Sequence, residues 1–268
     1  MAALIGEKHM TQDTHHDVLV VGASGAIGQA LVNQALAHLP SEARLIRMAR
    51  NPKSLPRLTT AHQIIDLAMD FSDSAQVPML FNQAHQDWSA ATGLEQPLAH
   101  LGQIWIATGL LHDAELQPEK RHQALSAQAL QRSFSVNAIG PSLLLSQILA
   151  VLPRRIMLKI GVLSARVGSI SDNRMGGWYS YRASKAALNM LLKTLAIELA
   201  RTHPNITLLG MQPGTTQSAL SAPFSRHVAP DALQSPEFTA QHLYQVLQQC
   251  QPSDSGKLLD FMGEFFEP

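Results

Sequence analysis

A tyrosine and a lysine lie four residues apart near the start of a strongly helical run. Because positions i and i+4 share one face of a helix, Tyr181 and Lys185 can point into the same cleft. Tyr179 has only Ala183 at that spacing. A phenol titrates near pH ~10 unless a nearby positive charge favours its ionised form. We therefore expect Lys185 to lower the pKa of Tyr181 and to make this phenol a proton donor or acceptor near neutral pH.

A phosphate-binding turn is predicted near the start of the chain. The apolar run 17–21 leads into a glycine-rich turn, and helical periodicity follows over residues 29–39. Glycine lets the backbone bend sharply and approach a pyrophosphate, and the start of the helix offers free N–H groups. The residues expected to bind a dinucleotide here are Gly22, Ser24, Gly25, Ala26, Ile27 and Gly28.

The end of the second predicted strand indicates which dinucleotide is bound. This strand covers residues 44–49 and is followed by Arg50. A fold that prefers NAD usually has an acid at this point to hold the ribose 2′-hydroxyl, whereas a guanidinium suits a 2′-phosphate. We therefore predict that the cofactor is NADP and that Arg50 binds its phosphate. Arg47 is a weaker candidate, because strand alternation can turn its side chain elsewhere.

Three further strand ends are predicted to contribute to the cofactor site. An acid after strand 63–69 can hydrogen-bond the adenine amino group, and Asp70 is preferred over its competitor Asp66. In open α/β sheets, ligands bind at the carboxyl ends of the strands. The residues that follow strands 103–107 and 206–211 are therefore also expected near the cofactor: Thr108, Gly109, Pro213, Gly214, Thr215 and Thr216.

Residues 121–152 are predicted to form a long helical stretch that is broken locally at Gly140-Pro141. Asn137 lies inside this stretch, where an asparagine is a mild misfit. Two interpretations stay open: Asn137 is an exposed or capping residue, or it holds a water beside Lys185. The second would make it part of the site.

The remaining patterned segments complete a single α/β domain over residues 17–268, after a flexible tail 1–16 in which Met10 is an alternative start. A segment rich in Ser, Pro and Ala, within residues 215–235, is predicted to form a lid over the substrate. The other expected elements are a strand at 156–163, helices at 181–201 and 236–249, and a closing strand at 256–261.

Composition excludes several classes of protein. Lys plus Arg and Asp plus Glu number 20 each, so no overall basic field favours nucleic acid or an anionic membrane. The single cysteine, Cys250, rules out an intramolecular disulfide and fits a reducing cytoplasm. No apolar run is long enough for a secretory signal or a membrane span, and no metal site is predicted.

Taken in order, these motifs resemble the short-chain dehydrogenase/reductase family. The resemblance covers residues 17–263, and the run 167–189 is similar to a branch of C-factor-like and carbonyl-reductase-like proteins. It implies a doubly wound, Rossmann-type sheet of about seven parallel strands and hydride transfer between a nicotinamide and a carbonyl or alcohol carbon. It also implies that Tyr181 is the acid/base, that Lys185 binds the nicotinamide ribose, and that Asn137 continues a proton relay.

Three positions depart from the family pattern. Ala26 replaces the usual middle glycine, and the fourth strand ends in Ile-Ala-Thr-Gly109 instead of Asn-Asn-Ala-Gly. Ala165 occupies the place of the serine that orients the substrate. Either Ser164 takes that role or Ser169 supplies the hydroxyl. Ser164 is the preferred candidate. If the strand keeps its register to residue 165, Ser164 faces the packed side and Ser169 is the better candidate, whereas Ser164 can rotate towards Tyr181 if the strand ends a residue early.

The expected function is therefore an NADP-dependent reductase of small, rather apolar aldehydes or ketones. The alternative is a dinucleotide-binding signalling or regulatory protein of the same fold with little turnover. A homodimer or homotetramer is also expected. Helix 181–201 carries more leucines than packing against one face of the sheet would bury, and residues 143–152 are similarly apolar.

Overall fold

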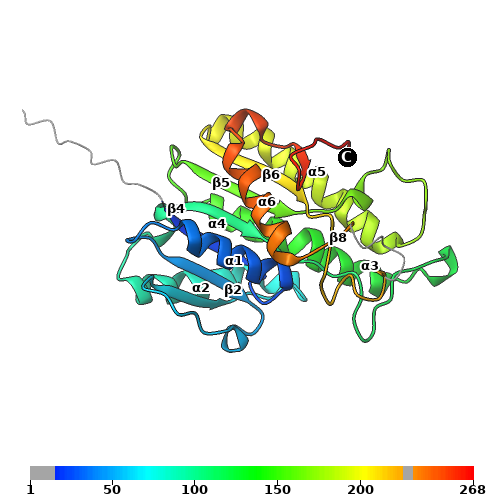
Figure 1. Ribbon diagram of the computed structural model, residues 1–268, viewed down its shortest axis with the longest axis horizontal. Coiled ribbons are helices and arrows are strands. Elements are labelled where there is room, and N and C mark those ends of the chain that lie inside the picture. The colour runs from blue at the N-terminus through cyan, green and yellow to red at the C-terminus, as the bar shows by residue number, and fades with distance from the viewer. Residues whose placement is uncertain (1–15, 226–231) are drawn as a thin grey trace, which may run out of the picture.

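The apolar runs predicted to be strands form one parallel sheet in the order β3-β2-β1-β4-β5-β6-β9 (Figure 1). The computed structural model describes residues 16–225 and 232–268. The predicted Rossmann-type fold in a single domain is confirmed. The strands of this sheet are β1 Asp17–Val21, β2 Leu45–Ala49, β3 Ile64–Ala68, β4 Leu101–Ile106, β5 Leu158–Leu163, β6 Ile206–Gln212 and β9 Leu258–Asp260.

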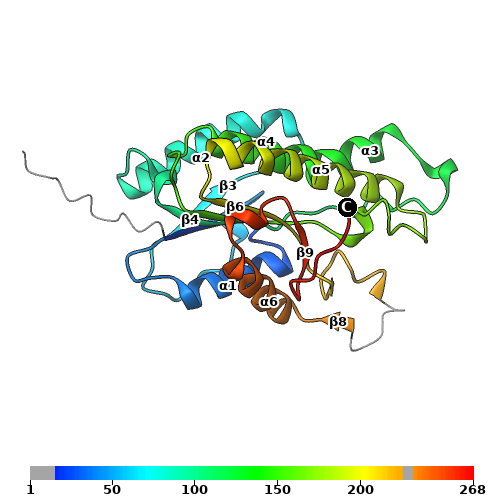
Figure 2. The same ribbon diagram turned by 90° about the horizontal axis from the view of Figure 1, so that it is seen from above.

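Helices cover both faces of this sheet. Figure 2 shows α1 and α6 on one face and α2, α4 and α5 on the other. Each face buries its own apolar core, so the central strands are apolar on both sides. The helices are α1 Ala26–His38, α2 Val77–Thr92, α3 Ala127–Phe134, α4 Gly140–Leu149, α5 Tyr179–Thr202 and α6 Pro236–Gln249.

The chain reverses its direction of travel across the sheet between β1 and β4. From β1 it builds outward through β2 and β3, and it then returns to place β4 on the other side of β1. The loops that follow β1 and β4 therefore diverge and leave a crevice at the carboxyl edge of the sheet. This edge is where the site residues were expected.

The predicted helical stretch 121–152 differs in detail from the structure. Regular helix begins only at Ala127, where the Ser126 side chain accepts the N–H of Ala129. No break occurs at Gly140-Pro141. Instead, a π-helix over Ser135–Ile139 joins α3 to α4. Proline has no N–H to give to the carbonyl four residues earlier, and the wider turn absorbs that loss without ending the helix.

Two short strands form in the predicted lid. Thr215–Thr216 (β7) pairs in parallel with Leu233–Gln234 (β8). Residues 226–231 of the predicted lid, and residues 1–15 of the predicted tail, lie outside the described residues.

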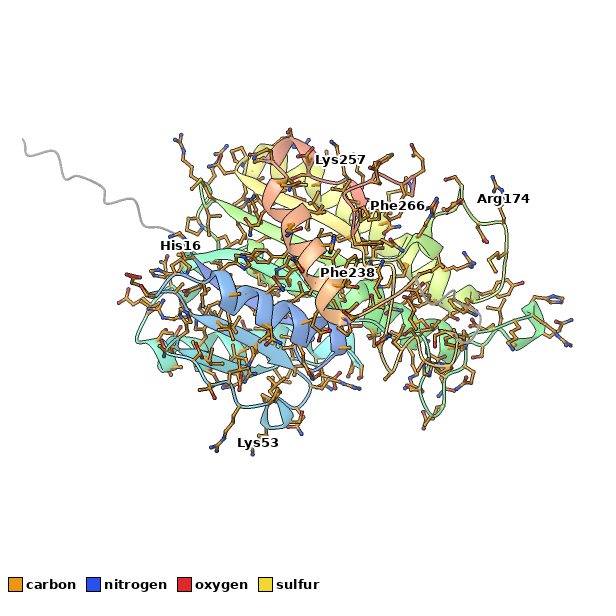
Figure 3. The ribbon with its side chains drawn as sticks, viewed as in Figure 1. His16, Lys53, Arg174, Phe238, Lys257 and Phe266 are labelled. Carbon is orange, nitrogen blue, oxygen red and sulfur yellow. The ribbon has the colours of Figure 1, made fainter. Side chains whose placement is uncertain are left out.

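Figure 3 shows Arg174 at the edge of the molecule, on the loop between β5 and α5. Among the described residues, no helix has the length and apolar character needed to cross a membrane.

Candidate active site

Helix α5 carries Tyr181 and Lys185 on its buried face, at the carboxyl edge of the sheet. The two residues are 9% and 2% exposed. The Nζ of Lys185 donates a hydrogen bond of 2.9 Å to the carbonyl of Leu163, the last residue of β5. The spacing of the two residues therefore places both against the sheet, beside the end of its fifth strand.

Burial shifts the pKa values of both groups. It raises the pKa of Tyr181 to about 12 and lowers the pKa of Lys185 to about 8. The expectation that Lys185 lowers the pKa of Tyr181 is therefore wrong for the protein alone, because removal from water disfavours the charged form of each group. At neutral pH Tyr181 keeps its proton and is ready to donate it.

Asn137 lies on the π-helix and is completely buried. Its Oδ1 accepts the N–H of Leu110 at 2.7 Å, and its Nδ2 donates to the Leu110 carbonyl at 2.8 Å. The same Nδ2 donates to the hydroxyl of Ser184 on α5 at 3.0 Å. Asn137 thus fastens the loop after β4 to the helix that carries Tyr181. The interpretation of Asn137 as an exposed residue is wrong.

The two candidate serines of the loop after β5 have different partners. Ser164 keeps the pairing of β5 with β6, and its hydroxyl donates to Oδ1 of Asn189, two turns beyond Tyr181 on α5. Ser169 accepts the N–H of Asp172 at 3.2 Å, and its hydroxyl lies 3.3 Å from that of Ser171. Within residues 16–225 and 232–268, neither hydroxyl is bonded to Tyr181. The strand thus keeps its register, and Ser169 is the freer donor.

The glycine turn after β1 packs closely against the end of β4. A Cβ on Gly22, whose φ is +82°, would lie 3.0 Å from the carbonyl of Ala107, and one on Gly28 would lie 2.1 Å from the Gly22 oxygen. Helix α1 follows with no side-chain cap and no acid in its first turn, so its first N–H groups remain free. Ala26 in this first turn leaves those groups in place.

Seven of the fifteen predicted cofactor residues line one cavity at the carboxyl edge. Arg50 is exposed at its rim, and in the described part of the chain it forms no ion pair. The competing Arg47 is buried and bonded through two nitrogens to Asp66, with both distances 2.7 Å. Because Arg47 and Asp66 bind each other, neither is available for the role considered for it, which was the 2′-phosphate for Arg47 and the adenine amino group for Asp66. The predicted residues that line the cavity are Gly22, Ser24, Gly25, Arg50, Asp70, Thr108 and Gly109.

The residues after β6 are placed differently from this group. Pro213, Gly214, Thr215 and Thr216 follow the carboxyl end of β6, but among the described residues they are not part of the cavity lining. The hydroxyl of Thr216 is 2.9 Å from that of Thr239 on α6. This segment therefore ties the start of the lid to α6, and its expected contact with the cofactor stays a prediction.

Three independent features of the cavity match groups of an NADP molecule. Thr108 has a buried hydroxyl with no hydrogen-bond partner in the described structure. The uncapped N-terminus of α1 favours a pyrophosphate, and Arg50 offers its guanidinium to a further phosphate. Each feature is unsatisfied in the protein alone and has a matching group in the dinucleotide.

Glu119 and Trp178, which sequence analysis missed, shape the start of α5. The Glu119 carboxylate accepts the N–H of Ser180 at 3.1 Å and also its hydroxyl. Its backbone carbonyl accepts the N–H of Trp178. Trp178 has φ 52° and ψ 44°, a left-handed conformation that costs roughly 1–3 kcal/mol for a bulky residue. Only the preceding Gly176-Gly177 hinted at this turn in the sequence.

The described part of the predicted lid contacts the loop after β4 and the start of α5. The Nε2 of His112 is within 3.1 Å of the Leu220 carbonyl, and the Leu220 side chain is 3.7 Å from the position of a Cβ on Gly109. Phe224 packs its ring 5.0 Å from that of Trp178.

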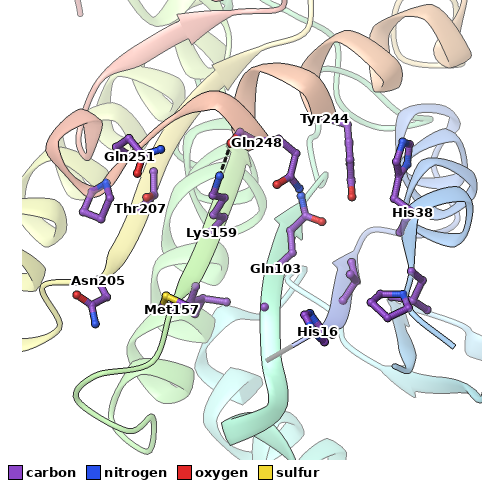
Figure 4. A pocket seen from close by; sticks show the side chains of 17 residues that line it. His16, His38, Gln103, Met157, Lys159, Asn205, Thr207, Tyr244, Gln248 and Gln251 are labelled. Carbon is purple, nitrogen blue, oxygen red and sulfur yellow. Dashed lines mark hydrogen bonds between the residues drawn. The ribbon is translucent and has the colours of Figure 1, made fainter. Parts of the chain in front are cut away.

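A second, larger hollow lies at the opposite, amino-terminal edge of the sheet (Figure 4). Lys159, at the start of β5, donates there to the carbonyl of Gln248 in the last turn of α6. An ammonium at a helix C-terminus satisfies a carbonyl that the helix leaves free. We therefore interpret Lys159 as a structural cap, separate from the chemistry at Tyr181.

A sequence model described as short chain dehydrogenase matches residues 16–229. The chain belongs to the short-chain dehydrogenase family. Its relatives in this family include the C-signal of Myxococcus xanthus, 31% identical over 134 residues that cover 50% of this chain and 75% of that protein. Benzil reductase ((S)-benzoin forming) of Bacillus subtilis (strain 168) is 24% identical over 257 residues, 90% of this chain and 96% of that protein. The predicted family and branch are confirmed.

Solved structures of carbonyl reductases share the fold of this short-chain dehydrogenase. The NADPH-bound carbonyl reductase from chicken fatty liver has a TM-score of 0.74 at 20% identity, covering 95% of this chain and 100% of that one. The carbonyl reductase Sniffer of D. melanogaster has a TM-score of 0.72 at 19% identity, with the same coverage. At these identities the likeness shows a shared architecture.

Proposed function

We propose that this protein is an NADPH-dependent reductase of small, rather apolar aldehydes or ketones. The observation that carries the proposal is the protonated phenol of Tyr181 beside Lys185, at the sheet edge that also holds the nucleotide cavity. A phenol with a pKa near 12 can donate a proton to a reduced carbonyl oxygen at neutral pH.

The preference for NADPH rests on Arg50. Its guanidinium lines the nucleotide cavity at the end of β2, where an NAD-binding site usually has an acid. Gly22 and the first turn of α1 would hold the pyrophosphate, and Thr108 would give its hydroxyl to the cofactor. The cofactor supplies the hydride that adds to the carbonyl carbon. The NADPH-bound neighbour supports this assignment.

The residues of α5 complete the reaction. Tyr181 transfers its hydroxyl proton to the carbonyl oxygen as the carbon receives the hydride, so the product is an alcohol. Lys185 lies one turn further along and would bind the nicotinamide ribose, and its charge would stabilise the phenolate left on Tyr181. Asn137 would continue the relay that returns a proton to Tyr181. Ser169 is the proposed donor to the substrate oxygen.

The experiment is a turnover assay with NADPH and a panel of aldehydes, ketones and quinones. Loss of NADPH absorbance that depends on the carbonyl compound and disappears in Tyr181→Phe would support the proposal. Tight NADPH binding without turnover on any of these compounds would contradict it.

One observation favours the second candidate, a dinucleotide-binding signalling or regulatory protein with little turnover. Ala165 stands at the usual serine position, and the hydroxyls of Ser164 and Ser169 already have partners within the protein. The relative named C-signal is compatible with such a role. NADPH binding without turnover in the same assay is the outcome that this candidate expects.

We also propose that the protein acts as a homodimer or homotetramer. The outer face of α5 leaves Met190, Leu191 and Ile197 exposed at 66%, 43% and 53%. An apolar groove between α4 and α5 continues this surface. Contiguous apolar surface of this kind on a soluble protein usually packs against a partner, and a second copy across a two-fold axis would cover it. Light scattering that returned the 29.2 kDa mass of one chain at micromolar concentration would refute this.

A further inference from the structure

A row of aromatic rings runs from Tyr181 to the lid. The ring of Trp178 lies 6.3 Å from that of Tyr181 and 5.0 Å from that of Phe224, and both contacts are edge-to-face. His112 extends the row, with its ring 5.5 Å from Phe224. Trp178 and Phe224 are only partly buried. Trp178 is thus the ring next to Tyr181, whose hydroxyl is proposed to meet the substrate carbonyl, and Phe224 lies next to Trp178.

The backbone is strained to hold Trp178 in this place. Its left-handed conformation is unfavourable for a bulky side chain, and it persists because Glu119 accepts its N–H and also holds Ser180. A glycine here would remove the strain and would keep the turn. The contacts of the indole ring are what a glycine at this position would lose.

We propose that Trp178 and Phe224 select substrates that carry an aromatic ring on or next to the carbonyl carbon. This inference rests on the proposed reductase function and names its substrate class. Edge-to-face and offset-stacked pairs of rings gain free energy beyond the burial of their area, whereas a saturated ring of equal size gains only the burial. The two side chains therefore discriminate aryl from alkyl substituents.

The test compares two aldehydes of equal ring size, benzaldehyde and cyclohexanecarbaldehyde. The ratio of their kcat/KM values is measured in the wild type and in single variants, so that the intrinsic reactivity of each aldehyde cancels. Trp178→Leu and Phe224→Leu should each lower the aryl-to-alkyl ratio about fivefold. Trp178→Phe should restore most of it, because the variant keeps a ring.

Tyr179→Leu is the matched control. Tyr179 is the next residue of the chain, is 38% exposed, and has no ring contact among the described residues. Its loss should leave the ratio unchanged. If Trp178→Leu fails to fold, as judged by its thermal unfolding, Phe224→Leu decides alone, because Phe224 does not have a left-handed backbone.

Calorimetric titration of benzaldehyde into the NADP⁺-loaded protein separates this inference from the proposed function. Wild-type reduction of both aldehydes with an unchanged ratio in the two leucine variants would overturn the aryl preference and leave the reductase function intact. Absence of any reduction, together with benzaldehyde binding that Trp178→Leu weakens, would overturn the function and keep the aryl site. Absence of both binding and reduction would overturn both.

Discussion

The cofactor end and the substrate end of the crevice are built from different parts of the protein. At the cofactor end the main chain does most of the work: Gly22 and Gly28 allow close packing of the turn, and the first turn of α1 presents free N–H groups. At the substrate end, side chains from distant segments meet, as Glu119 does with Ser180 and Asn137 with Ser184. We therefore expect cofactor binding to survive side-chain changes that strongly reduce turnover.

The largest effect should come from Tyr181→Phe. Because this change removes a proton donor and no binding surface, we expect kcat to fall about 10³-fold while the Kd of NADPH stays within about twofold. Stopped-flow and fluorescence titration measure the two quantities, with Tyr179→Phe as the control. A kcat close to that of the wild type would remove Tyr181 from the mechanism.

The loop serines provide the next test. A hydroxyl that stabilises charge on the carbonyl oxygen should be worth about 10²-fold in kcat. We expect this loss in Ser169→Ala and a smaller one in Ser164→Ala, whose hydroxyl is already donated to Asn189. Steady-state kinetics of both variants decide between them. Near-wild-type turnover in both would favour the signalling alternative.

Glu119→Ala should reduce kcat about twentyfold, because it removes the buried carboxylate that accepts two hydrogen bonds from Ser180, the residue before Tyr181. The Kd of NADPH should not change, since Glu119 lies at the substrate end. Glu119→Gln keeps one acceptor and should recover part of the loss. Equal losses of kcat and of NADPH affinity would mean that the two ends are not independent.

The smallest of these effects should appear in Arg50→Ala, the one variant directed at a side chain of the cofactor end. We expect the Kd of NADPH to rise about tenfold and that of NADH to remain unchanged, because only NADPH carries the 2′-phosphate. Lys53→Ala, on the same loop, is the control. Equal weakening of the two cofactors would show that Arg50 is structural.

Sequence patterns were most informative where the relevant contacts are local. The first strand, the glycine turn and α1 lie within residues 17–38, so spacing alone indicates their arrangement. The pair Tyr181 and Lys185 is likewise local, four residues apart on one helix. For these features the predicted arrangement in the fold agrees with the structure.

Patterns failed where distant segments or burial decide the outcome. Glu119 and Ser180 are 61 residues apart in the sequence, and no pattern around either residue predicts their hydrogen bond. The pKa of Tyr181 depends on how completely the fold removes the phenol from water, which spacing cannot report. The predicted break at Gly140-Pro141 was wrong because a π-helix can absorb a proline.

The buried ammonium of Lys185 links the stability of the protein to pH. Its pKa is about 8 in the folded chain against 10.5 for free lysine, so between these values the unfolded chain holds the extra proton and folding becomes more favourable as pH rises. Tyr181 reverses this trend only above pH 10. Between about pH 7.5 and about pH 9.5, the Tm of the protein without cofactor should therefore rise. The Tm of the Lys185→Met variant should rise less over the same interval, because the variant lacks the titrating ammonium. The positive charge on Lys185 that the proposed reaction needs is thus the charge that destabilises the protein without cofactor.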